Sequence, residues 1–329
     1  MKQAIPYSTY GAALALMLIA CAFSARAAVA YPERPVRWIV AAAAGGGADA
    51  SARIIAPELT KVLGQPVVID NRPGASGTIG INLVAKATPD GYTFGAGSIS
   101  NISMNRATRK NMPFDPDTEL QAVVQTHTQP NVLVVSLSLP VKSVTELIDF
   151  AKKSTAELLY ASSGNGSSLH FAGALFSSMS GAPMRHIGYN SVPFALNDVI
   201  AGRVPIIFDN LSSSAPHVKG GRVRGIAVTG LQRSSVLPDL PTIAASGLPG
   251  YEITVWSGII VAAGTPKPVI ERLNAAVNQA LEIPAVRERL TTGLGLQIVG
   301  GGAEPFARLI RSETLKWKTV ADKAGIKAE

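Results

Sequence analysis

Residues 36–63 read VRWIVAAAAGGGADASARIIAPELTKVL, and this stretch decides the fold. The apolar run from Val36 to Ala41 predicts a buried strand, and the segment from about Ala50 to Leu63 has the periodicity of an amphipathic helix. The glycines between them predict a tight turn from strand to helix. A strand, a glycine turn and a helix are the unit from which parallel sheets covered by helices are built. The stretch therefore predicts an α/β fold.

The same unit recurs along the chain. Further strands are expected at 67–70, 92–96, 158–161, 185–188, 205–208, 225–229 and 253–262. Helices are expected at 80–87, 144–152, 169–180, 193–201, 267–281, 285–291 and 304–324. Two strand-like runs, Ala122 to Gln125 and Val132 to Ser136, have no clear helix between them, and we interpret them as the crossing between two lobes. This predicts a first lobe at 31–130, a second lobe at 131–229, and a return to the first lobe with a C-terminal helix at 230–329.

Composition narrows the class of protein. The length of 329 residues exceeds the usual size of one domain, which also favours two lobes. The formal net charge is +8, but the basic residues are scattered and form no stripe with aromatic residues, so nucleic acid is the least favoured partner. A single cysteine excludes an internal disulfide, and the four histidines are dispersed. We therefore expect no metal site, no cofactor and a protein that acts as a monomer.

The first 30 residues have the features of an export signal. Lys2 is followed by an apolar run from Gly11 to Phe23 and by small residues at 25–30. Because a bilayer-spanning helix needs about 20 apolar residues, a cleaved signal peptide at 1–30 is favoured over a permanent anchor. This predicts a periplasmic protein. Cys21 follows Leu-Ile-Ala, so a lipid anchor on this cysteine remains an alternative to free release.

Two glycine-containing loops at strand-to-helix junctions are the candidate binding elements. The first, Gly45 to Asp49, has glycines that let a ligand approach the backbone closely, and the free N–H groups at a helix start attract anions. Asp49 suits the N-cap of the helix. The second, Ser162 to Ser168, adds hydroxyl and amide groups, with His170 in the first turn of the following helix. One such loop can be a tight turn that binds nothing, and His170 alone can be a capping or packing residue. Two loops in separate lobes predict a ligand held between the lobes.

Other polar residues follow strands and can contribute to the same cleft. Ser98 and Asn101 follow a first-lobe strand, with ordinary solvation of a loop as the alternative. Asp209 ends a second-lobe strand, where ligand crevices form, and its alternative role is to brace a loop. A catalytic site has little support, because the hydrolase pattern G-x-S-x-G is missing. We therefore predict a binding protein and not an enzyme.

Several motifs, in order along nearly the whole chain, resemble those of one family. They are YPERP at 31–35, GQPVV at 64–68, NRPGA at 71–75, ATPDGY at 87–92, PNVL at 130–133, NGSS at 165–168, FDN at 208–210, LPDLPT at 237–242 and AGIK at 324–327. The family is that of the solute-binding proteins of tripartite tricarboxylate transporters, also called the Bug family.

The resemblance implies a fold and a ligand. The fold is that of type II periplasmic binding proteins, with two α/β lobes joined by a hinge, and the ligand is a small mono-, di- or tricarboxylate, aromatic ones included. Carried over onto this sequence, the carboxylate is held by Gly46, Gly47, Ala48, Asp49, Ser163, Asn165, Gly166, Ser167 and His170. The other end of the ligand is contacted by positions that vary within the family, and our candidates for these are Ser98, Asn101 and Asp209.

The resemblance also implies a partner. The partner is a transporter with integral membrane subunits, to which the closed form hands the ligand. The alternatives are a sensor that presents its closed form to a membrane receptor and, less favoured, a cleft hydrolase. The sequence departs from the family pattern at Ala41 to Ala44, where prolines are usual, and at Asn190, where a basic residue is common. These departures bear on the identity of the ligand and not on the fold.

Overall fold

The computed structural model describes residues 31–323, 325 and 326. The predicted signal peptide at 1–30, with Cys21, lies outside this part of the chain. Within the described part, no helix has the length and apolar character needed to cross a membrane.

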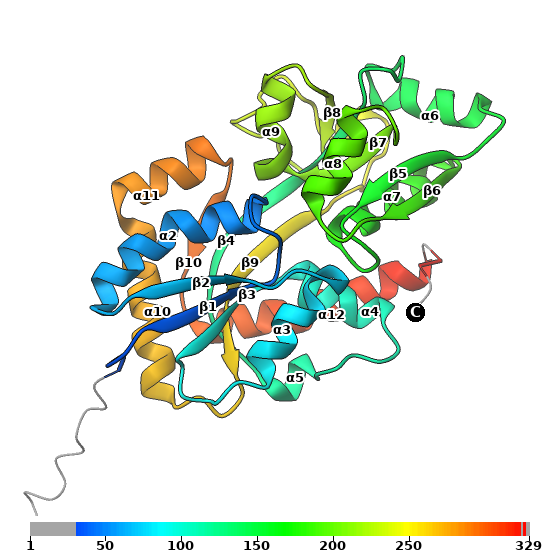
Figure 1. The fold of residues 1–329 in the computed structure, drawn as a ribbon. Helices are drawn as coiled ribbons and strands as arrows, with labels where there is room; N and C mark the ends of the chain where they lie inside the picture. The colour runs from blue at the N-terminus through cyan, green and yellow to red at the C-terminus, as the bar shows by residue number, and fades with distance from the viewer. Residues whose placement is uncertain (1–30, 324, 327–329) are drawn as a thin grey trace, which may run out of the picture.

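The first lobe is built on three parallel strands (Figure 1). Its elements are β1 (Val36–Val40), α2 (Gly47–Leu63), β2 (Val67–Asn71), η1 (Ala75–Gly77), α3 (Thr78–Ala85) and β3 (Thr93–Ser98). β1 lies between β2 and β3 and pairs in parallel with both. Helix α2 buries Ala52, Ile55 and Leu59, which are three or four residues apart and share one side of the helix.

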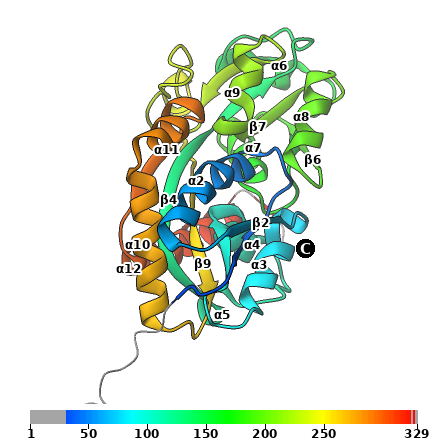
Figure 2. The same ribbon diagram turned by 60° about the vertical axis from the view of Figure 1, so that its left-hand side comes forward.

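Strand β4 (Leu120–Val135) connects the two lobes. It is reached through three short helical segments, η2 (Ile99–Met104), α4 (Asn105–Thr108) and α5 (Pro116–Glu119). From Leu120 to Pro130 it pairs with β9, and from Asn131 onward it pairs with β7 and β8. Figure 2 shows β4 passing from one lobe into the other. The expectation of two separate runs was therefore wrong, because the polar residues between them belong to one continuous strand of 16 residues.

The second lobe contains a further series of strands and helices. Its elements are α6 (Val144–Lys153), β5 (Leu158–Ser162), α7 (Ser168–Ser180), β6 (Met184–Gly188), α8 (Val192–Ile200), β7 (Ile206–Asn210), α9 (Leu211–Lys219) and β8 (Arg224–Val228). β5 pairs in parallel with both β6 and β7. Sequence reasoning missed α9, which follows β7 directly.

The chain then returns to the first lobe. The returning elements are η3 (Ala244–Ser246), β9 (Thr254–Ala262), α10 (Lys267–Glu282), α11 (Pro284–Glu288), η4 (Arg289–Gly293), β10 (Gln297–Gly300) and α12 (Ala303–Lys323). Through β4, the described strands join in the order β2-β1-β3-β9-β4-β7-β5-β6, and β8 and β10 also pair with β4. Strand β10 was not predicted.

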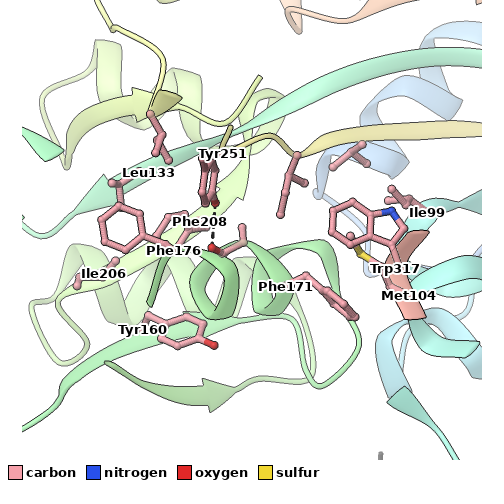
Figure 3. Packing of buried hydrophobic residues seen from close by; sticks show 14 of the residues in the cluster. Ile99, Met104, Leu133, Tyr160, Phe171, Phe176, Ile206, Phe208, Tyr251 and Trp317 are labelled. Atoms are coloured by element: carbon pink, nitrogen blue, oxygen red, sulfur yellow. Dashed lines mark hydrogen bonds between the residues drawn. The ribbon is translucent and has the colours of Figure 1, made fainter. Parts of the chain in front are cut away.

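The largest cluster of buried apolar residues extends across both lobes (Figure 3). Phe171 of α7 meets Trp317 of α12 edge to face, with ring centroids 5.5 Å apart. The hydroxyl of Tyr251 donates a hydrogen bond of 2.9 Å to the carbonyl of Ala172 in α7. The C-terminal helix therefore belongs to the core that joins the lobes.

The predicted fold class, two α/β lobes joined by a hinge, is confirmed. The residue boundaries given to the lobes, at 130/131 and 229/230, stay predictions.

Candidate functional site

A cavity of about 130 Å³ lies between the lobes. Its walls come from the loops after β1, β2 and β3 in the first lobe, from β4 and β9, and from the loops after β5, β6 and β7 in the second lobe. The first lobe contributes Ala41, Ala42, Ala43, Gly46, Gly47, Ala48, Pro73, Gly74, Ser76, Gly77, Ala96, Ser98, Ser100 and Asn101. The connecting strands and the second lobe contribute His127, Gln129, Val255, Ser257, Ser163, Ser167, Ser168, Asn190, Ser191, Val192, Pro193 and Asn210.

The start of α2 forms one wall. Gly46 is the N-cap, in an extended conformation, and Gly47 is the first helical residue. The Gly47 N–H points across the cleft and donates to Ser213 Oγ at 3.3 Å. A Cβ on Gly47 would overlap the hydroxyl of Ser212, so only glycine allows this close approach between α2 and α9.

Asp49 fixes the shape of this loop from behind. It is the third residue of α2, so the expectation that it caps the helix was wrong, because Gly46 holds that position. Its buried carboxylate accepts hydrogen bonds from Gly45 N at 2.9 Å, Arg53 Nε at 2.9 Å and Asn71 Nδ2 at 3.0 Å. Burial acts to raise the pKa of Asp49, but these hydrogen bonds outweigh it and lower the pKa. Asp49 is not among the residues that line the cavity.

The start of α7 forms the facing wall. Ser167 is the N-cap, and its hydroxyl accepts from His170 N at 3.2 Å and donates to Gly164 O at 2.7 Å. The next residue, Ser168, is 1% exposed and lines the cavity. Its N–H donates to Ser100 Oγ of the first lobe at 2.9 Å, whereas its own hydroxyl has no hydrogen-bond partner among the described residues. The Ser168 hydroxyl is therefore buried at the cavity wall with its hydrogen-bonding capacity unused.

Three of the predicted second-loop residues lie outside the lining. The carbonyl of Asn165 accepts from Ser76 Oγ at 2.7 Å. A Cβ on Gly166 would lie 2.7 Å from Thr108 Oγ1, so this glycine also permits a close contact between the lobes. The ring of His170 stacks on His186 with centroids 4.0 Å apart, and burial together with His186 lowers the pKa of His170 to about 3. His170 is therefore a neutral packing residue behind the loop.

Ser98 and Asn101 line the cavity at the start of η2. They form a reciprocal cap in which Asn101 N donates to Ser98 Oγ at 3.4 Å and Ser98 N donates to Asn101 Oδ1 at 2.7 Å. Asn101 Nδ2 donates to Ala96 O at 3.2 Å. The pair therefore shapes the end of β3, and the Ser98 hydroxyl keeps a proton to donate.

Asp209 is fully buried and lies outside the lining. Its carboxylate accepts from Asn210 N and from Ser214 Oγ, both at 2.7 Å, which braces the start of α9. Burial raises the pKa of Asp209 to about 7, although both hydrogen bonds act in the opposite direction.

Sequence reasoning missed several lining residues. Asn190 to Pro193 form the β6–α8 junction, a third strand-to-helix turn, and Pro193 in its first turn was the available signal. His127 and Gln129 lie on β4, where the only signal was polar residues inside an otherwise apolar strand. Ser76 gave no signal, because its hydroxyl reaches the opposite lobe from a turn with positive φ.

The lining of the cavity is neutral. Among the described residues, those that line it include no Asp, Glu, Lys or Arg, and no group of three or more possible metal ligands occurs in that part of the chain. Hydroxyls, amides and the positive ends of the helices are the available binding groups, although the N–H groups of Gly47 and Ser168 already donate across the cleft. Such groups bind anions because the N-terminal end of a helix carries partial positive charge.

A hydrogen-bonding cavity enclosed by two α/β lobes is the arrangement in which solute-binding proteins hold a small ligand. The model of the "Tripartite tricarboxylate transporter family receptor" matches residues 51–326, and the chain belongs to this family. The resemblance to the Bug family is confirmed. Its members are binding receptors, so the prediction that this chain is not an enzyme is also confirmed.

Individual relatives agree with this assignment. "UPF0065 protein in tcbD-tcbE intergenic region" of Pseudomonas sp. strain P51 is 39% identical over 308 residues, covering 93% of this chain and 91% of the relative. The structure of the periplasmic binding protein BugD is 32% identical, with a TM-score of 0.86 and coverage of 91% of this chain and 100% of that one.

Two similar structures contain a ligand. R. palustris Rpa4515 with adipate is 37% identical, with a TM-score of 0.88 and coverage of 91% of this chain and 100% of that one. MatC from Rhodopseudomonas palustris with bound malate is 31% identical, with a TM-score of 0.84 and coverage of 88% and 99%.

Proposed function

We propose that this chain is a periplasmic receptor that binds a small organic carboxylate between its lobes and delivers it to a tripartite tricarboxylate-type transporter. The observation that carries the proposal is the convergence of two helix starts, those of α2 and α7, on one neutral cavity. The carboxylates held by Rpa4515 and MatC support the ligand class. Membership of a family of transporter receptors supports a transporter as the partner.

Within this proposal, the ligand contacts are the predicted residues that line the cavity: Gly46, Gly47, Ala48, Ser98, Asn101, Ser163 and Ser167. We add Ser168, because its hydroxyl is buried there without a partner. Asp49, Asn165, Gly166, His170 and Asp209 act behind them by holding the loops in place. A change of strand partner at Pro130 and Asn131 supports the proposed lobe boundary at 130/131.

A panel of carboxylates tests the ligand class. Thermal unfolding is measured with adipate, malate, succinate, citrate, benzoate and glutamate, alongside the corresponding neutral amides. At 100 times its dissociation constant, a ligand adds about 2.7 kcal/mol to the free energy of unfolding, which is a readily measured shift in Tm. We expect at least one carboxylate, and none of the amides, to give this shift. No shift with any carboxylate would contradict the proposal.

The Ser168 hydroxyl provides a test at the level of one atom. Ser168→Ala removes an unpaired donor at the cavity, so we expect the dissociation constant of the tightest carboxylate to rise about 3- to 30-fold, as for one hydrogen bond. Ser177→Ala is the matched control, because this hydroxyl of the same helix donates to Ala182 O instead. Isothermal titration calorimetry measures both. Equal affinities in the two variants would exclude Ser168 from the site.

Delivery and export have separate tests. With the membrane subunits of the transporter in vesicles, we expect this chain to be required for uptake of the bound carboxylate. The mass of the N-terminal fragment of the exported protein distinguishes cleavage near residue 30 from lipidation at Cys21.

A further inference from the structure

His127 lines the cavity from β4, where it pairs with Ser257 of β9. It is 4% exposed, so its imidazole is almost completely enclosed. Of its two ring nitrogens, Nδ1 lies 3.0 Å from the hydroxyl oxygen of Thr126. Among the described residues, none forms a hydrogen bond with Nε2. The remaining polar atom of this cavity residue is thus available to a ligand.

The surrounding hydrogen bonds define which nitrogen carries the proton. A threonine hydroxyl has one proton, and Thr126 donates it to Ser257 O at 3.1 Å. In its contact with His127 the hydroxyl oxygen must therefore accept, so Nδ1 carries the hydrogen. Burial lowers the pKa of His127 to about 4, so the ring is neutral near pH 7. In a neutral ring with a protonated Nδ1, Nε2 is an acceptor.

Gln129 lies two residues further along β4 and also lines the cavity. Residues two apart on a strand lie on the same face. Its Oε1 accepts from Ser212 N at 3.1 Å, which directs the amide so that Nε2 supplies the free donors. One face of β4 therefore brings an acceptor and a donor to the cavity lining, whereas the helix starts around it present donors.

We propose that this pair makes the receptor selective for a carboxylate that also carries a hydroxyl group. A hydroxyl can donate to His127 Nε2 and accept from Gln129 Nε2 at the same time. A second carboxylate cannot donate to His127, and an ammonium group cannot accept from Gln129. An aliphatic analogue would leave both buried groups without partners, which weakens binding. This inference rests on the proposed carboxylate-binding function.

The test compares three four-carbon acids that differ at one substituent: malate, succinate and aspartate. Dissociation constants are measured by calorimetry for the unmodified protein. We expect malate to bind about 10- to 100-fold more tightly than succinate and aspartate, as for a hydroxyl with two buried partners. Equal binding of malate and succinate would overturn this inference and leave the proposed function standing. If no carboxylate of the wider panel binds, both fall.

Variants test whether His127 and Gln129 cause the preference for malate over succinate. His127→Phe keeps a planar ring without an acceptor, and we expect the ratio between malate and succinate to fall towards one. His127→Gln can place an oxygen near the position of Nε2, and we expect it to retain most of the ratio. Thr128→Ala is the control, since Thr128 lies on the same strand outside the cavity lining. A ratio that persists in His127→Phe would show that His127 does not bind the hydroxyl. If that variant does not fold, two other variants decide the matter: His127→Gln, expected to retain most of the ratio, and Gln129→Leu, for which we expect the ratio to approach one.

Discussion

At the scale of single residues, the buried polar side chains differ in whether they contact the cavity or support it. Asp49 and Asp209 both have every carboxylate oxygen engaged by loop or helix groups, and neither lines the cavity. Ser168 and His127 both line it: the Ser168 hydroxyl has no hydrogen-bond partner among the described residues, and the His127 ring bonds there only through Nδ1, to Thr126. A residue type alone therefore does not identify a ligand contact, because the hydrogen bonds already made behind the loop decide its role.

Asp209 gives a prediction for the dependence of stability on pH. Its pKa is raised to about 7, so between about pH 4 and 7 it is protonated when folded and ionised when unfolded, and stability falls as pH rises through this window. The lowered pKa values of His127 and His170 have the opposite effect, because these rings gain a proton only on unfolding at acidic pH. We expect Asp209→Asn to make the free energy of unfolding rise more steeply with pH, by up to about 1.4 kcal/mol per pH unit. Urea denaturation at pH 4.5, 5.5 and 6.5 measures this. Parallel curves for the variant and the unmodified protein would contradict it.

At the scale of elements, both lobes contribute the N-terminal turns of helices to the cavity. The N-terminal turns of α2, α7 and α8 all contribute lining residues, and each directly follows a strand of the sheet. Because carboxyl ends of neighbouring parallel strands lie at one edge of a sheet, these turns gather at the same place.

Gly47 at the start of α2 tests whether close packing between the lobes is needed for ligand binding. Gly47→Ala would place a methyl group against the hydroxyl of Ser212, so we expect the lobes to close less completely and carboxylate binding to weaken at least tenfold. Gly293→Ala is the control, because a Cβ at this glycine would have no atom within 4 Å and the residue lies outside the cavity lining. Calorimetry with the tightest carboxylate of the panel compares them. Similar losses in the two variants would show that closure does not require the glycine at position 47.

Elements with a clear apolar run or a clear helical periodicity could be predicted from the sequence. Elements in which polar residues interrupt that pattern could not. The run from Val36 to Ala41 and the periodic apolar residues of α2 gave a strand and a helix within a few residues of their observed bounds. Strand β4 was divided because Thr126, His127 and Gln129 interrupt its apolar run, although His127 and Gln129 line the cavity. Helix α9 was missed because it contains three serines and Pro216. In the site, the glycine loops were evident, but distant contacts such as Ser76 with Asn165 depend on how the lobes meet.

At the scale of the whole molecule, the lobes touch directly at the rim of the cavity. Ser76 Oγ donates to Asn165 O at 2.7 Å, Ser168 N donates to Ser100 Oγ at 2.9 Å, and Gly47 N donates to Ser213 Oγ at 3.3 Å. These bonds require the closed arrangement and no ligand. They therefore add to the stability of the closed form independently of the ligand.

Ser76→Ala tests this contribution. We expect the loss of one hydrogen bond between the lobes to weaken carboxylate binding about 2- to 10-fold, because more of the ligand's binding energy is used to close the lobes. Small-angle scattering of the unliganded variant should show a larger radius of gyration. Ser246→Ala is the control, since that hydroxyl donates to Thr242 O within one turn. An unchanged affinity and radius in Ser76→Ala would show that this contact does not influence closure.

Pro130 stands where β4 changes partners, opposite Thr254 of β9 and directly before Asn131, which pairs with β7. A proline has no amide hydrogen, so it donates no ladder hydrogen bond at this position, although its carbonyl can still accept one. A sheet that bends here in every cycle of capture and release has one fewer bond to break and remake. A movement of the lobes centred on Pro130 would therefore disturb the ladder of β4 less than one centred on a residue with an amide hydrogen.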